Sequence, residues 1–194
     1  MKSITEIYEG IINEAWGINL VSVDIQPAYS SHIRFLDKFV DFINTEDFAK
    51  VLYLFNGPDL GYESESKLID WLYEIGVNPD KIDSFEFFDK GYAFLRGWMD
   101  TNVDDNDIIK VGQYLLKNNL RSSDELDEDD YSKLGLDELY NNSDSIWLPE
   151  VTDELKRLTK PLLCGGGKNE CLAEVELLFK ILKKPYKRHK QFIY

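Results

Sequence analysis

The sequence is short of cysteine and histidine, with two residues of each in a chain of 194. Cys164 and Cys171 provide neither a disulfide framework nor a CxxC zinc pattern, so we expect both to be free thiols. Long apolar runs are also missing, and none approaches the roughly 18 residues that a membrane span requires. Residues 1–16 mix acids among apolar positions and lack the uninterrupted apolar core of a signal peptide. We therefore expect a cytoplasmic protein without membrane contact.

Positive charge is scarce as well, since 22 Lys and Arg face 36 Asp and Glu for a net charge of −14. Proteins that bind nucleic acid neutralise phosphates with Lys and Arg, so nucleic acid is not an expected partner. Ten of the 22 basic residues lie in residues 156–194, beside three acids. This basic segment is either a contact surface or, as charge patterning favours, a solvated or self-complementary face. The expected partners are a small-molecule substrate and, as an open alternative, a second copy of the chain.

Apolar runs and amphipathic segments alternate along the chain, which is the pattern of a parallel α/β fold. We predict one domain over residues 1–194, with a three-layer α/β/α, Rossmann-like architecture and a mainly parallel sheet of five or six strands. The predicted helices, after a first one in residues 3–16, cover about 30–44, 64–76, 105–119, 152–160 and a segment from Asn169. The predicted strands lie near residues 19–25, 50–56, 84–90, 161–165 and 186–194.

An acidic segment interrupts this alternation at about residues 120–147. Nine acids and a single lysine lie between Asp124 and Asp144. Such a segment is either a surface insertion or a lid, and we favour the insertion because charged runs are usually solvated.

Reactive side chains follow three of the predicted strands. In a parallel sheet ligands bind beyond the carboxyl ends of the strands, so Asp24, Lys90 and Cys171 are expected at one edge. A helix N-terminus and a neighbouring ammonium favour the thiolate form of a cysteine, and a carboxylate can transfer the proton. The open alternative is that Cys171 is a small apolar residue in a tight strand-to-helix corner. Cys164 lies inside an apolar strand and is predicted to be core.

Three stretches of the sequence match a known family in order: "VSVDIQPAY", "FFDKGYAFLRGWMD" and "LLCGGGKNECLAEV". With them the chain resembles the isochorismatase-like cysteine hydrolases over most of its length, apart from the first helix and residues 103–155. The resemblance implies an Asp24–Lys90–Cys171 triad, an acyl intermediate on the cysteine and an oxyanion hole beside a cis peptide just upstream of it. It also implies the three-layer α/β/α fold.

Further residues follow as candidates for substrate binding. Gln26 and the backbone at Gly167 and Lys168 are expected to orient the substrate and its oxyanion, while Tyr92 and Phe94 are spaced to line a pocket. Lys168 stands where the family has threonine. Some family members hold a metal with an Asp and two His, but "FNGPDLGYESE" contains no His, so we expect neither a metal nor a cofactor.

Two other function classes stay open. A metal-dependent nuclease of the PIN or NYN type would hold Mg²⁺ with carboxylates, for which the candidates are Asp24, Asp59, Asp100 and Glu170. A catalytically inactive binding or regulatory protein with the hydrolase fold is the other alternative.

Overall fold

The computed structural model describes residues 17–90, 95, 103–141 and 145–194. Within them one parallel sheet has the strand order β3-β2-β1-β4-β5. The strands are β1 (Ile18–Val23), β2 (Phe48–Phe55), β3 (Phe85–Asp89), β4 (Leu162–Gly165) and β5 (Lys187–Arg188). The predicted α/β class is confirmed. The chain builds the sheet outward from β1 through β2 to β3 and then returns to the other side of β1 with β4 and β5.

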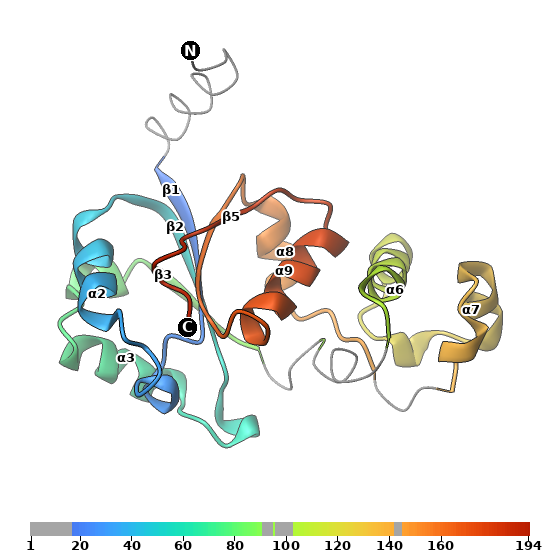
Figure 1. The fold of residues 1–194 in the computed structure, drawn as a ribbon, viewed down its shortest axis with the longest axis horizontal. Coiled ribbons are helices and arrows are strands. Elements are labelled where there is room, and N and C mark those ends of the chain that lie inside the picture. Colours follow the sequence, from blue (N-terminus) through green and yellow to red (C-terminus); the bar gives the residue numbers. More distant parts are fainter. Residues whose placement is uncertain (1–16, 91–94, 96–102, 142–144) are drawn as a thin grey trace, which may run out of the picture.

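Helices cover both faces of the sheet and complete three layers (Figure 1). One face packs against α2 (Leu36–Thr45), α3 (Glu65–Glu74) and α4 (Pro79–Ile82). The other face packs against α8 (Val151–Arg157) and α9 (Cys171–Ile181), with α6 (Asp105–Asn118) and α7 (Glu128–Leu134) in the same hydrophobic cluster. No helix in the described part of the chain is long and apolar enough to cross a membrane.

The central strand β1 shows why the sheet is buried on both sides. Val21 and Val23 belong to the core on the α9 side, whereas Leu20 belongs to the core on the α2 side. Successive side chains of a strand point to opposite faces, so a continuous apolar run serves both cores at once.

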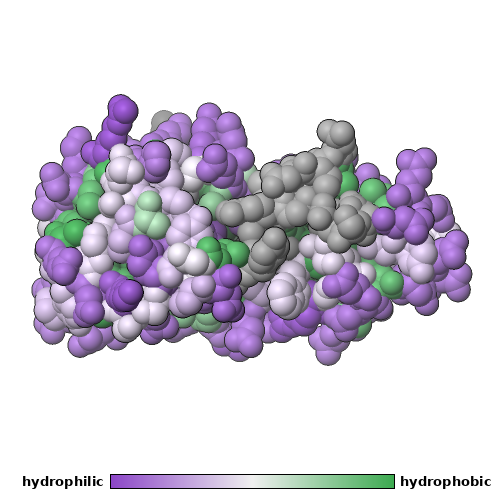
Figure 2. Space-filling model, turned by 90° about the horizontal axis from the view of Figure 1, so that it is seen from below, coloured by the Kyte–Doolittle hydropathy of each residue, from purple (hydrophilic) through white to green (hydrophobic). Residues whose placement is uncertain are grey.

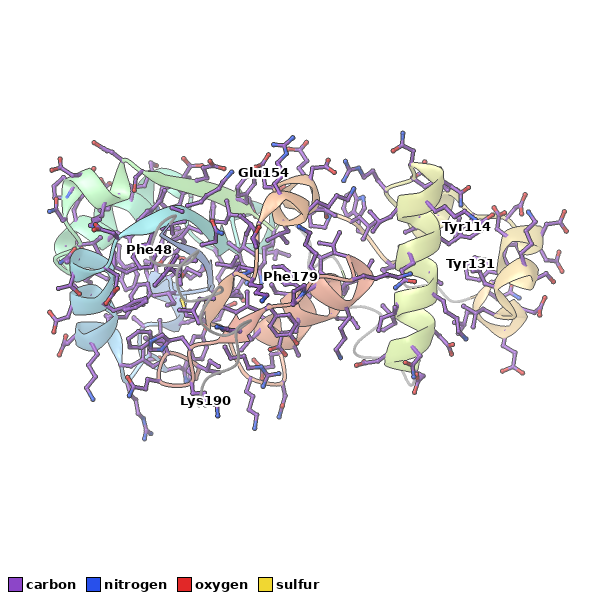
Figure 3. All side chains as sticks on the ribbon, turned by 90° about the horizontal axis from the view of Figure 1, so that it is seen from above. Phe48, Tyr114, Tyr131, Glu154, Phe179 and Lys190 are labelled. Carbon is purple, nitrogen blue, oxygen red and sulfur yellow. The ribbon has the colours of Figure 1, made fainter. Side chains whose placement is uncertain are left out.

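Helix α9 is apolar on nearly all sides because it lies between the sheet and α6. Of its residues, all but Ala173 and Lys180 are buried. Helix α6 approaches it closely at Gly112, where a Cβ atom would come within 2.6 Å of Ile181 Cδ1. In Figure 3, Tyr114 of α6 and Tyr131 of α7 lie at a similar position along the long axis of the molecule, beyond Phe179 of α9. Both views thus place α6 and α7 beyond α9.

The acidic segment is folded, and its acids serve as helix caps. Ser122 and Asp127 each form a capping box, at η3 (Ser123–Glu125) and α7 respectively. Its apolar residues Leu126, Tyr131 and Leu136 are buried in the core on the α9 side. On the face drawn in Figure 2, hydrophilic side chains cover most of the end of the molecule that carries α7. None of the described residues of the segment lines the pocket described below.

The C-terminal segment differs from its prediction as a strand over residues 186–194. Only β5 pairs with the sheet, at Lys187 and Arg188. Beyond it, His189 stacks on Phe192 with ring centroids 4.0 Å apart, and Phe192 packs against Phe39 and Phe42 of α2. Ring packing and single backbone hydrogen bonds, such as that from the Tyr194 N–H to the Gly166 carbonyl, hold this segment in place of regular strand pairing. They bring Tyr194 to the carboxyl end of β1, where its hydroxyl donates to the Asp24 carbonyl. The predicted helix at residues 3–16 lies outside the described residues.

Candidate active site

The site lies where the strand order reverses, between β1 and β4. Chain connections leave these neighbouring strands in opposite directions, which opens a crevice at their carboxyl ends. Asp24 follows β1 directly, and the segment from Gly165 to Cys171 joins β4 to α9. The sequence-based expectation of a shared sheet edge is met by these two segments.

Asp24 is fully buried in a constrained backbone position. Its φ angle is +51°, in the left-handed region, which Asp adopts more readily than most residues. Its backbone N–H donates to the Leu54 carbonyl at 2.9 Å, and its carbonyl accepts from the Tyr194 hydroxyl at 2.9 Å. The backbone of Asp24 is thus fixed from β2 and from the C-terminal segment.

Lys90 reaches Asp24 across the end of β2. It follows β3, its backbone N–H donates to the Phe55 carbonyl, and its Nζ lies 2.8 Å from Asp24 Oδ2 with both side chains fully buried. Burial alone would lower the pKa of Lys90, but Coulombic interaction with Asp24, Glu174 and Cys171 outweighs it and raises that pKa. Lys90 is therefore charged at neutral pH and within electrostatic reach of Cys171.

Cys171 is the first residue of α9, and the glycines before it form a tight corner. Gly165 and Gly166 have φ angles of +76° and +67°, and a Cβ on Gly165 would lie 2.1 Å from the Val23 carbonyl oxygen. Side chains other than hydrogen are therefore excluded from Gly165. Cys171 itself is 6% exposed and borders a pocket.

The pocket has a volume of about 930 Å³, within the usual range for small-molecule sites. Its walls come mainly from the segment after β1 and from the β4–α9 corner. Four aromatic rings form one side, with Tyr29 5.5 Å from Tyr62 and 6.3 Å from Tyr194, and with Phe35 beside Tyr194. The polar and charged lining residues are Ser31, His32, Arg34, Asn169, Glu170 and Glu174.

Glu174 is a member of this site that the sequence analysis missed. It lies one helical turn after Cys171, is 1% exposed, and its Oε2 is 3.7 Å from Lys90 Nζ. Its Oε1 accepts the backbone N–H of Leu95 at 2.9 Å. The available signal was an acid at position i+3 from the cysteine in a largely apolar helix.

Of the predicted substrate-binding residues that the structure describes, Gly167 lines the pocket and Gln26 and Lys168 do not. The Gln26 amide is engaged with the backbone of Asn56, at 3.1 and 2.8 Å, and with Glu63. Lys168 is exposed, and its backbone N–H donates to the Tyr194 carbonyl at 3.0 Å. Tyr92 and Phe94 lie outside the described residues.

Two features that the resemblance or the alternatives implied are absent from the described part of the chain. Its peptide bonds include no cis bond, so the cis peptide expected upstream of Cys171 is not found. Its His, Cys, Asp and Glu side chains include no group of three that could hold a metal ion. Of the metal ligands considered for a nuclease, Asp24 is paired with Lys90, and Asp100 lies outside the described residues.

Cys164 lies inside β4 and is fully buried, as a core cysteine would be. Burial raises its pKa to about 12. The two thiols of the chain therefore occupy different environments, since Cys171 borders the pocket whereas Cys164 is enclosed by the core.

Comparison of the chain with protein-family models, with curated proteins and with solved structures finds no match.

Proposed function

We propose that the protein is a cytoplasmic, isochorismatase-like cysteine hydrolase that cleaves an amide, ester or related bond of a small molecule. One observation carries the proposal: Lys90, in a buried ion pair with Asp24, interacts electrostatically with Cys171, which lines a pocket, although the three residues come from distant parts of the chain. Buried ionisable groups cluster at functional sites, where burial and charged neighbours tune their pKa values, and burying charge is otherwise costly.

In the first step Cys171 Sγ attacks the carbonyl carbon of the substrate. The thiol proton passes to the Asp24 carboxylate, whose Oδ1 has no hydrogen-bond partner among the described residues. Lys90 stabilises the negative charge that develops on sulfur, and the backbone at Gly167 is the candidate for binding the carbonyl oxygen. The bond to the leaving group breaks, the leaving group takes the proton from Asp24, and a thioester stays on Cys171.

In the second step water attacks the thioester carbonyl. Asp24 takes a proton from this water, the carbon–sulfur bond breaks, and the proton returns to Cys171 Sγ. The acid product leaves and the site returns to its initial state. Asp24 acts in both steps, and Lys90 holds its carboxylate in place throughout.

The test compares the two cysteines of the same motif. Hydrolysis of a panel of small carboxamides and esters is measured for the wild type, Cys171→Ala and Cys164→Ala. We expect Cys171→Ala to lose turnover by at least about a thousandfold, while Cys164→Ala keeps it, because only Cys171 borders the pocket. Equal turnover in the wild type and Cys171→Ala would refute the proposal.

A further inference from the structure

Glu174 places a second carboxyl group, besides that of Asp24, near the ammonium of Lys90. Lys90 Nζ is 2.8 Å from Asp24 Oδ2 and 3.7 Å from Glu174 Oε2, and these three side chains are at most 1% exposed. Neither Asp24 Oδ1 nor Glu174 Oε2 has a hydrogen-bond partner in the described residues. Among the described residues this buried cluster thus holds two carboxyl groups against one lysine, and of these three residues Glu174 lines the pocket.

The position of Glu174 directs this charge toward the pocket. Cys171 and Glu174 are three residues apart on α9, so they share one helix face, and both line the pocket. The described basic residues that line the pocket, Arg34 and His32, come from the segment after β1 and are solvent-exposed, where charge is screened. Next to the thiol the described buried cluster, with two carboxyl groups and one lysine, therefore dominates over these exposed residues, because interactions of buried charges are screened much less.

We infer that Glu174 is a specificity-determining residue, which makes the space beside Cys171 select neutral groups with N–H donors, such as a carboxamide, and reject carboxylates. The inference deepens the proposed function, on which it rests for the reactive thiol. A carboxamide supplies hydrogen-bond donors to a site with unused acceptors, whereas a carboxylate adds a like charge. Hydrolysis of an amide yields a carboxylate, so the same group that favours the substrate also promotes release of the acid product.

Two alkylating reagents test the selection without a known substrate. Iodoacetamide and iodoacetate differ only in a neutral amide against a carboxylate. With both, Cys171 Sγ displaces iodide and forms a sulfur–carbon bond while the thiol proton goes to the buffer. Peptide mass spectrometry at pH 8 gives each rate for Cys171, and the ratio of the two rates is divided by the same ratio for glutathione. Because the same thiolate attacks both reagents, this normalised ratio is independent of how much thiolate is present.

In the wild type we expect the normalised ratio to favour iodoacetamide by roughly tenfold, which corresponds to about 1.4 kcal/mol of charge repulsion. Glu174→Gln removes the charge and keeps the shape and the acceptor for the Leu95 N–H, so the ratio should fall toward the glutathione value. Glu170→Gln is the matched control, because Glu170 also lines the pocket but is exposed. Its ratio should stay within about twofold of the wild type.

The outcomes separate the inference from the proposed function. If Cys171 reacts but shows the glutathione ratio, or prefers iodoacetate, the inference is wrong and the proposed nucleophile stands. The same holds if Glu174→Gln leaves the ratio unchanged. If Cys171 reacts with neither reagent in the folded wild type, both the proposed function and the inference fail. The wild-type ratio alone can overturn the inference, so a Glu174→Gln variant that does not fold leaves the test valid.

Discussion

Replacing Lys90 with methionine should strongly destabilise the protein. Methionine keeps much of the length and apolar character of the side chain but removes the ammonium that lies between Asp24 and Glu174. Removing one partner of a buried ion pair typically costs about 3–5 kcal/mol, because the other charge stays buried without compensation. Two carboxylates lose their partner here, so we expect the upper half of that range.

The assay is urea unfolding at pH 7, followed by circular dichroism, with Lys110→Met as the matched control. Lys110 also forms an ion pair, with Asp107 at 2.7 Å, but its side chain is 51% exposed. Exposed pairs contribute little, so Lys110→Met should change the free energy of unfolding by less than about 1 kcal/mol. The double variant Asp24→Asn/Lys90→Met should recover part of the loss, since one uncompensated charge disappears.

The pH dependence gives a second check on Lys90. Its raised pKa means that the stabilisation from its charged form is fully present below the ordinary lysine value of 10.5 and is lost only as the pH rises through the higher folded-state pKa. Ionisation of Lys90 should therefore cause no loss of stability between pH 6 and 9. A Lys90→Met variant as stable as Lys110→Met would show that Lys90 does not compensate buried carboxylates, and the reasoning about this site would be wrong.

Two further predictions concern the β4 strand and its corner. Burial raises the pKa of Cys164 from 9.0 to about 12, so the unfolded chain loses this proton first as the pH rises. Relative to Cys164→Val, the wild type should lose about 1.4 kcal/mol of stability per pH unit between pH 9 and 12, and parallel urea-unfolding curves for the two proteins would contradict this. Gly165→Ala should cost at least about 3 kcal/mol, because its Cβ would overlap the Val23 carbonyl. Gly61→Ala, which has a similar φ of +80° but no atom within 4 Å of its Cβ, should cost only about 1 kcal/mol, and equal losses would refute the steric argument.

The sequence predicts the sheet well because apolar runs ending at Pro or Gly leave few alternatives. It also predicts that Asp24 and Cys171 lie at one edge, since parallel strands place their carboxyl ends together. The direct contact of Lys90 with Asp24 across β2 depends on the strand order, which the sequence does not reveal.

Other parts of the site depend on long-range packing. In the sequence Glu174 resembles any other acid of a helix. Its contact with Lys90 depends on which face of α9 packs toward the end of β3, and the sequence does not reveal this. Tyr194 donates a hydrogen bond to the carbonyl of Asp24, 170 residues earlier in the chain. Ring packing of the C-terminal segment and backbone hydrogen bonds to Gly166 and Lys168 place it there. The composition of the acidic segment predicts a solvated insertion. Spaced apolar residues such as Tyr131 and Leu136 nevertheless pack into the core.

The most direct test of the account is to look for an acyl group on Cys171 during turnover of p-nitrophenyl acetate, by rapid quenching and peptide mass spectrometry. The account predicts an acetyl group on Cys171 that is hydrolysed in the wild type and, once formed, is hydrolysed more slowly in Asp24→Asn, because Asp24 activates the water for deacylation. An unmodified Cys171 throughout turnover, or an adduct that disappears equally fast in Asp24→Asn, would contradict the central claim that these two residues work as nucleophile and base.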